Sequence, residues 1–339
     1  MKKRVSITLN QEISKNIAKT KADCLILGIN EGKTLKGLAA EVDEIIGGGI
    51  KELVKRGEFD GKVGNSSYIS VNRGLSADRL FLIGCGNSNK SINNEDMDKI
   101  ASSVTNSLAS KKSVNGVIAL PSFKYESKDH KDADLLQKLG VSIENKVYTY
   151  DAKLNKKNQK INYLKKISVC ITSKESITTL KKGLKVGQSI GQGMNVAKDL
   201  ANLPGNICTP TYLATTSRAV SKKYKKISCR VYGEKEMKKM GMDCLLSVGN
   251  GSAQESKLIS MSYKGGKKNE KPYAIVGKGI TFDTGGISLK PPATMDEMKF
   301  DMCGAASVIG TMQVVAELNL PINLIGVVAS AENMPGSKA

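Results

Sequence analysis

The sequence predicts an α/β protein in which an N-terminal α/β domain is followed by a larger α/β domain with a mixed, largely parallel sheet. Three observations support this fold class. Short apolar runs typical of strands alternate with stretches of helical period along most of the chain. The 339 residues exceed the length that a single core usually supports. Apolar residues make up 40% of the sequence and charged residues 25%, as in ordinary globular proteins.

The first domain is expected over residues 1–175. Apolar runs predict its strands at residues 5–9, 24–30, 79–85, 116–121 and 167–172. Helical periodicity predicts helices over residues 35–56 and 95–109. The lysine-rich stretch 153–166 has few apolar residues, and we interpret it as a loop or insertion near the end of this domain.

A linker helix is expected between the domains, over residues 176–205. Its apolar side chains recur at spacings of three and four residues, at Val186, Ile190, Met194, Ala197 and Ala201. The pattern stops at a Pro-Gly pair, residues 204–205, which marks the end of a helix. We therefore place the domain junction here.

The second domain is expected over residues 206–339. A helix should begin after Pro210, with further helices over residues 234–240 and 302–318. Strands are predicted at residues 227–232, 257–263, 273–276 and 323–331. Alternating strands and helices favour a largely parallel sheet, and such sheets bind ligands beyond the carboxyl ends of their strands.

The cysteines and the single histidine exclude several kinds of site. The seven cysteines form no Cys-x-x-Cys pair and lie mostly in apolar, strand-like contexts, so we interpret them as buried reduced thiols. One histidine, His130, excludes a His-x-x-x-His zinc motif and argues against a Ser-His-Asp triad. A metal site in this chain must therefore use carboxylates, carbonyls or less usual ligands.

The formal net charge is +20, and it is unevenly distributed. Residues 1–270 carry +21, whereas residues 271–339 carry −1. A field of this kind attracts polyanions, so one interpretation is DNA binding through the basic N-terminal region. The alternative is a lysine-rich solvated surface, because only six of the 52 basic residues are arginine, the residue that base-reading proteins favour.

The sequence gives no sign of a membrane partner. The basic residues at the N-terminus are not followed by an apolar segment of signal-peptide type. No apolar run approaches the roughly 18 residues that a membrane-spanning helix needs. A soluble, cytoplasmic protein is expected.

The stretch from residue 276 to residue 306 contains the candidate chemical groups. Lys278, Asp283, Lys290 and Asp301 lie in a glycine-rich context after a predicted strand, and we expect them to project from loops around that strand's end. Alternatively, such residues are helix caps or surface charges. Binding of phosphate by the glycines is also possible, although neither the G-x-x-x-x-G-K-[ST] nor the G-x-G-x-x-G spacing is present.

The same stretch resembles the metal-binding core of the leucyl (cytosol) aminopeptidase family. The similarity is carried by VGKGITFDTGGISLKP at residues 276–291 and MDEMKFDM at residues 295–302. It extends to DLANLPGNICTP at residues 199–210, VGNGSAQ at 248–254 and AENMP at 331–335, in the family's order. Residues 1–172 resemble the family only in their α/β character.

The resemblance implies roles for individual residues. Lys278, Asp283 and Asp301 would be metal ligands, with Asp283 bridging two divalent ions, Mn or Zn, and the other two binding the more exchangeable ion. Lys290 would be a catalytic cation that polarises the scissile carbonyl of the substrate. Met298 would line the pocket for the first side chain of a peptide substrate. Ordinary core packing is the alternative for Met298.

The function implied is that of a dinuclear metal-dependent aminopeptidase, leucine-preferring and homo-hexameric, that uses a metal-bridged water. The alternatives are a bifunctional DNA-binding aminopeptidase and an inactive truncated homologue. The family's second motif, Asn-Thr-Asp-Ala-Glu-Gly-Arg, supplies the remaining ligands and a catalytic Arg, and it would lie beyond Ala339. We therefore expect the catalytic domain to lack its C-terminal part, and residues 1–339 alone to be inactive.

Overall fold

The computed structural model describes residues 5–71, 73–109, 112–129, 131–150 and 163–337. The chain divides into two compact units, and the division falls between Gly191 and Gln192, within α5 (Ile177–Ala201). This position lies inside the stretch expected to be a linker helix. His130 and most of the predicted 153–166 loop lie outside the described residues.

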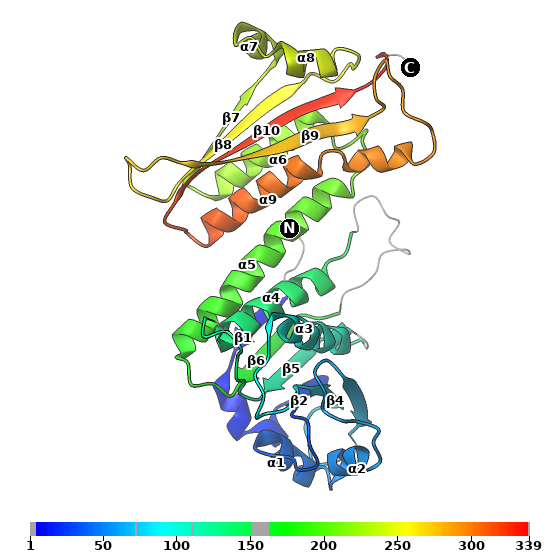
Figure 1. Cartoon of the computed structure of the whole chain (residues 1–339), viewed down its shortest axis with the longest axis vertical. Coiled ribbons are helices and arrows are strands. Elements are labelled where there is room, and N and C mark those ends of the chain that lie inside the picture. Colours follow the sequence, from blue (N-terminus) through cyan, green and yellow to red (C-terminus); the bar gives the residue numbers. More distant parts are fainter. Residues whose placement is uncertain (1–4, 72, 110–111, 130, 151–162, 338–339) are drawn as a thin grey trace. The chain divides into compact units, whose positions relative to one another are not determined.

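The first unit is built on a six-stranded sheet in the order β1-β6-β5-β2-β4-β3 (Figure 1). The strands are β1 (Ser6–Leu9), β2 (Cys24–Ile29), β3 (Ser66–Ser70), β4 (Arg79–Gly84), β5 (Asn115–Leu120) and β6 (Lys166–Ile171). All neighbouring strands are parallel except β3, which runs antiparallel to β4 at the edge. The five strands predicted for this domain are confirmed within one or two residues at each end.

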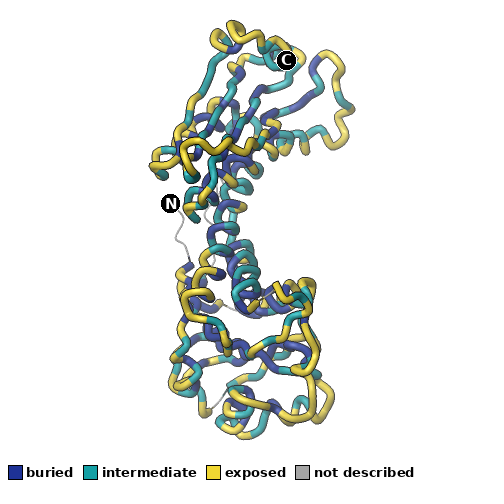
Figure 2. Tube along the Cα trace, turned by 60° about the vertical axis from the view of Figure 1, so that its left-hand side comes forward, coloured by how far each residue is buried: buried dark blue, intermediate teal, exposed yellow. Residues whose placement is uncertain are grey.

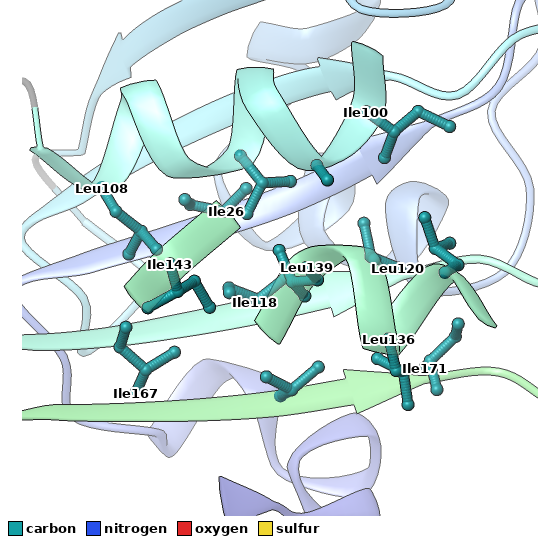
Figure 3. Packing of buried hydrophobic residues seen from close by; sticks show 14 of the residues in the cluster. Ile26, Ile100, Leu108, Ile118, Leu120, Leu136, Leu139, Ile143, Ile167 and Ile171 are labelled. Atoms are coloured by element: carbon teal, nitrogen blue, oxygen red, sulfur yellow. The ribbon is translucent and has the colours of Figure 1, made fainter. Parts of the chain in front are cut away.

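Helices cover both faces of this sheet because its central strands are apolar on both sides. In β2, Ile26 packs on one face while Leu25 and Leu27 pack on the other. The Ile26 face is covered by α3 (Asn94–Ala109) and α4 (Asp132–Val147), whose isoleucines and leucines meet those of the strands (Figure 3). The opposite face is covered by α1 (Leu38–Ile45), α2 (Gly49–Lys55), η1 (Gln11–Lys15) and η2 (Ile17–Lys19).

Three local predictions for this unit were wrong or incomplete. The single helix expected over residues 35–56 is two helices, because Gly47 and Gly48 adopt positive φ angles of 82° and 90° that end α1. Helix α4 was not predicted, although its buried leucines follow helical spacing. Strand β3 was also missed, since its serines give an edge strand little apolar signal.

The second unit contains a four-stranded mixed sheet in the order β7-β8-β10-β9. Its strands are β7 (Ile227–Tyr232), β8 (Lys257–Lys264), β9 (Tyr273–Asp283) and β10 (Asn323–Asn333). β10 is parallel to β9 and antiparallel to β8, which is also antiparallel to β7. The α/β class and the mixed character of this sheet are confirmed, and over the two sheets together most described pairings are parallel. Within the second sheet, however, only the pairing of β9 with β10 is parallel.

Helices α6 (Pro210–Lys223) and α9 (Cys303–Glu317) pack their apolar residues on one face of the second sheet (Figure 1). Thr209 caps α6 by accepting a hydrogen bond from the N–H of Tyr212, and Pro210 occupies the first turn. Short helices α7 (Glu234–Lys239), α8 (Asp243–Gly249) and η4 (Met295–Phe300) complete the unit, and α8 packs on β10.

Burial follows this architecture, with buried positions on strands and inner helix faces and exposed positions on the connections (Figure 2). The first half of β9 is an exception: Tyr273 and Val276, predicted to belong to a buried strand, are 68% and 73% exposed at the sheet edge. All seven cysteines are free thiols, as predicted, but Cys244 is exposed. No described helix is both long and apolar enough to cross a bilayer.

Candidate metal centre

Strand β9 positions two of the four candidate residues. The strand extends to Asp283, seven residues beyond its predicted end, because it pairs with β10 along its length. Lys278 therefore lies within a strand and Asp283 at its last position, and the expectation that both project from loops was wrong. Lys290 lies in the loop after β9, and Asp301 is the residue that ends η4.

The glycines that suggested a loop serve a packing purpose. A Cβ atom on Gly277 would stand 2.4 Å from the carbonyl oxygen of Gly304, and one on Gly304 would stand 2.8 Å from the backbone nitrogen of Lys278. Any larger residue at either position would force the start of α9 away from β9. This close approach brings Asp301, two residues before α9, beside Lys278.

Lys278 and Asp301 form an ion pair. The Nζ atom of Lys278 lies 2.8 Å from Oδ1 of Asp301 and 2.7 Å from Oδ2. Oδ2 is buried and receives no hydrogen bond of good geometry, so among the described residues the ammonium charge is its compensation. The lysine side chain is 59% exposed, which leaves room for it to move away from the carboxylate.

Asp283 is the most buried of the four residues, at 8% exposure. Its Oδ1 accepts hydrogen bonds from the N–H of Gly285 at 2.9 Å and from Nδ2 of Asn333 at 2.7 Å. Its Oδ2 lies 3.1 Å from Nζ of Lys290. The turn that presents the Gly285 N–H needs glycine, because Gly285 and Gly286 have φ angles of +90° and +66°.

These contacts determine the charge of Asp283. Burial by itself raises the pKa of its carboxyl group, but the hydrogen bonds from Gly285, Lys290 and Asn333 outweigh burial and lower the pKa. Asp283 is therefore ionised at neutral pH. The side chain of Asp301 also interacts with that of Asp283, so the two carboxyl groups are adjacent.

The donor set fits a divalent cation. Two adjacent carboxylates provide hard oxygen ligands, and the Lys278 amine lies against one of them. Two ammonium groups offset the carboxylate charges, at the positions where a bound cation would do the same. No group of three or more His, Cys, Asp or Glu side chains gathers within the described residues. These residues therefore suit one ion, and a second ion would need further donors.

The other segments that carry the resemblance lie around the same strand ends. A Cβ atom on Gly205 would lie 3.2 Å from the side chain of Phe282, so the 199–210 segment packs next to Asp283. Gly251 lies against the backbone of Met334, and the hydroxyl of Ser252 donates to the Glu332 carboxylate. Contacts thus join the 248–254 segment to the 331–335 segment.

Met298 and Asn333 also contact residues of this site, and the sequence suggested a role for the first and none for the second. Met298 lies half-buried in η4, where its carbonyl oxygen accepts from the N–H of Asp301 at 3.3 Å. Its role in binding substrate stays a prediction. Asn333 was quoted only as part of the AENMP segment and was given no role, yet it holds Asp283. The signal that could have identified it is that β9 and β10 are parallel and end together.

Comparison with known proteins places both units in one family. Residues 26–157 match the N-terminal domain of the cytosol aminopeptidase family, and residues 195–339 match its catalytic domain. A probable cytosol aminopeptidase of Alkalilimnicola ehrlichii is 40% identical over 326 residues, which are 96% of this chain and 65% of that protein. The cytosol aminopeptidase of Pseudomonas aeruginosa is 40% identical over 320 residues, or 94% and 63% of the two proteins.

The fold is also that of a solved structure. A tomato leucine aminopeptidase variant aligns with a TM-score of 0.76 and 21% identity, covering 98% of this chain and 63% of that chain. At this identity the similarity shows the fold alone. The chain spans about 65% of the length of the curated relatives it matches.

Proposed function

Because the chain belongs to the cytosol aminopeptidase family, we propose that the full-length gene product is a metal-dependent aminopeptidase that removes N-terminal residues, leucine preferentially, from peptides. The observation that carries this proposal is the cluster formed by Lys278 and Asp283 of β9, Lys290 of the loop after β9, and Asp301 at the end of η4. The two adjacent carboxylates are each paired with a lysine, and a divalent metal ion can replace those lysine charges.

We propose that the metal is two divalent ions, Mn or Zn, and that Lys278, Asp283 and Asp301 would be part of their ligand set, with Asp283 shared between the ions and further donors completing the site. Bound there, the ions would lower the pKa of a water molecule and polarise the substrate carbonyl. Lys278 can coordinate only as a neutral amine, so it must release the proton that it now shares with Asp301.

Lys290 has a separate role in this proposal. Its ammonium group is 3.1 Å from Oδ2 of Asp283, and a cation bound to that oxygen would compete with it. Once displaced, Lys290 remains charged and can donate a hydrogen bond to the oxygen of the scissile carbonyl as negative charge develops. Asp283 itself keeps its orientation through Gly285 and Asn333, which bind its other oxygen.

Several further features belong to the same proposal. We propose that Met298 lines the pocket for the first side chain of the substrate, that the protein assembles as a homo-hexamer and that it acts in the cytoplasm, as the names of its relatives suggest. The domain limits 1–175, 176–205 and 206–339 also stand as a proposal.

The test is a pair of aspartate substitutions in the full-length gene product. Asp283→Asn should abolish hydrolysis of leucine p-nitroanilide and reduce bound metal, because it removes one carboxylate charge from the cluster. Asp296→Asn is the matched control, since Asp296 is an exposed aspartate of η4 and should leave both unchanged. A variant Asp283→Asn with near-wild-type kcat/KM at saturating Mn²⁺ would show that the assignment is wrong.

A further inference from the structure

A cavity of about 800 Å³ lies in the first unit, apart from the residues of the candidate metal centre. It is lined by segments that follow four of the parallel strands: residues 30–39 after β2, 87–89 after β4, 121–125 after β5, and 172, 174 and 175 after β6. Its volume is in the range of sites that enclose small organic ligands.

The topology of the sheet favours a binding site at this place. β2 and β5 are parallel neighbours, but the chain leaves them in opposite directions. After β2 it enters α1 on one face of the sheet, and after β5 it enters α4 on the other. Two connections that diverge in this way leave a crevice between them, and open α/β sheets bind their ligands there.

The segment after β2 presents its backbone to the cavity. A Cβ atom on Gly28 would lie 2.5 Å from Pro121, so the end of β2 packs closely against the β5 loop. Further along, Gly32 and Gly37 have φ angles of +134° and +54° and open space where a side chain would stand. Gly37 precedes α1 and has no side chain to cap it. Its carbonyl oxygen accepts from the N–H groups of Ala40 and Glu41, which leaves the N–H groups of Leu38 and Ala39 for an anion.

Charge at the cavity supports the same kind of ligand. Five lysines line it, namely Lys33, Lys36, Lys124, Lys131 and Lys174, against three acidic residues. Lys33 and Lys36 lie in the segment just before the uncapped start of α1, and no ion pair formed among the described residues involves either. An excess of positive charge beside free backbone donors is suited to phosphate.

Acidic and hydroxyl groups are also present at the cavity. Asp132 is buried and accepts hydrogen bonds from the hydroxyls of Tyr125 at 2.7 Å and Ser173 at 2.6 Å. Glu175, three residues of chain beyond Thr172, has a buried Oε2 atom to which no described residue donates. A buried carboxylate oxygen without a donor is costly, and a ligand hydroxyl would satisfy it.

We propose that this cavity binds a small phosphorylated ligand of the nucleoside diphosphate class. Its phosphates lie against the start of α1 and the Lys33 and Lys36 ammonium groups, and a sugar hydroxyl donates to Glu175. This site is independent of the aminopeptidase chemistry proposed above, because every residue in it belongs to the first unit.

Calorimetric titration of the full chain with ADP, pyrophosphate and adenosine tests the proposal. ADP should bind most tightly, pyrophosphate more weakly and adenosine weakest. The reason is that only ADP has both the phosphates that contact the lysines and the sugar hydroxyl that contacts Glu175. The double variant Lys33→Glu/Lys36→Glu should weaken ADP binding by about tenfold or more, since two charge-assisted contacts are lost. Its control is Lys235→Glu/Lys239→Glu, which changes the net charge equally on exposed lysines of α7.

A second variant tests the contact with the sugar separately from the contacts with the phosphates. Glu175→Gln should weaken binding of ADP but leave binding of pyrophosphate unchanged, and circular dichroism with a thermal melt checks that each variant is folded. The proposal is overturned if ADP does not bind at millimolar concentration, if adenosine binds as well as ADP, or if both lysine pairs weaken binding equally. Binding of duplex DNA without binding of ADP would likewise overturn it and assign the lysines to a nucleic-acid surface.

Discussion

Asn333 donates a hydrogen bond to Asp283 across the ends of two parallel strands, with Nδ2 of Asn333 2.7 Å from Oδ1 of Asp283. The two residues are also register partners of β10 and β9. The carbonyl oxygen of Asn333 accepts from the N–H and the hydroxyl of Thr284, at 2.9 and 2.8 Å. One residue thus fixes both the candidate bridging carboxylate and the turn that follows it.

Replacing Asn333 by alanine should lower activity through the loss of this positioning bond. A hydrogen bond to a charged group contributes about 1.5–3 kcal/mol, which corresponds to a loss of roughly tenfold or more in kcat/KM. Asn323→Ala is the control, because Asn323 begins the same strand and its side chain holds the backbone of residues 266–270. Equal losses of activity in the two variants would show that stability alone is affected.

Substituting Gly304 should move Asp301, just before the start of α9, away from Lys278 on β9. The Cβ of Gly304→Ala would overlap the backbone of Lys278 and displace α9 from β9, at a cost of about 1–3 kcal/mol in the free energy of unfolding. Metal affinity should fall with it, because Asp301 moves with the start of α9. Gly336→Ala, where a Cβ would meet no atom within 4 Å, should change neither the thermal midpoint nor the metal titration.

Lys290→Ala should separate catalysis from metal binding. If Lys290 only stabilises the developing oxyanion, kcat of the full-length gene product falls by about 10²–10³ while bound metal, measured by atomic emission, stays at the wild-type level. Lys290→Arg, which keeps the charge, should recover part of kcat. A loss of metal in the alanine variant would instead identify Lys290 as a ligand.

The cysteines should differ in their reactivity toward iodoacetamide. Burial raises the pKa of the Cys85 and Cys208 thiols to about 12, so almost none of either is thiolate at pH 8. Cys244 is exposed and should be alkylated first. Peptide mass mapping of the folded protein over time gives the order, and early modification of Cys85 would contradict the buried environment described for it.

The sequence predicted the order of strands and helices well because apolar periodicity directly reflects burial on a face. It failed where a residue's conformation depends on a distant neighbour. Gly277 was interpreted as part of a loop, since nothing nearby in sequence indicates that Gly304 packs against it. Asn333 received no role for the same reason: its partner Asp283 is 50 residues away, and the pairing follows only from the register of β9 and β10.

The four charged residues illustrate the same limit. Their identities and spacing drew attention to them in the sequence, and the fold brings them into two linked ion pairs, Lys278 with Asp301 and Lys290 with Asp283. Which lysine meets which aspartate could not be predicted from spacing. The strand places Lys278 five residues before Asp283, and the approach of α9 selects Asp301 as its partner.

The polypeptide of residues 1–339, tested by itself, should bind at most one divalent ion and bind it weakly. At this site the carboxylates of Asp283 and Asp301 are adjacent, and no group of three or more His, Cys, Asp or Glu gathers within the described residues. Two dications at close distance need more negative charge than two carboxylates supply. Calorimetric titration with Mn²⁺ and Zn²⁺ should therefore give a stoichiometry of one or less and no hydrolysis of leucine amide. Asp301→Asn should remove the remaining binding, whereas Asp296→Asn should not. Tight binding of two ions, or sustained turnover by this polypeptide, would mean that residues other than these complete the site.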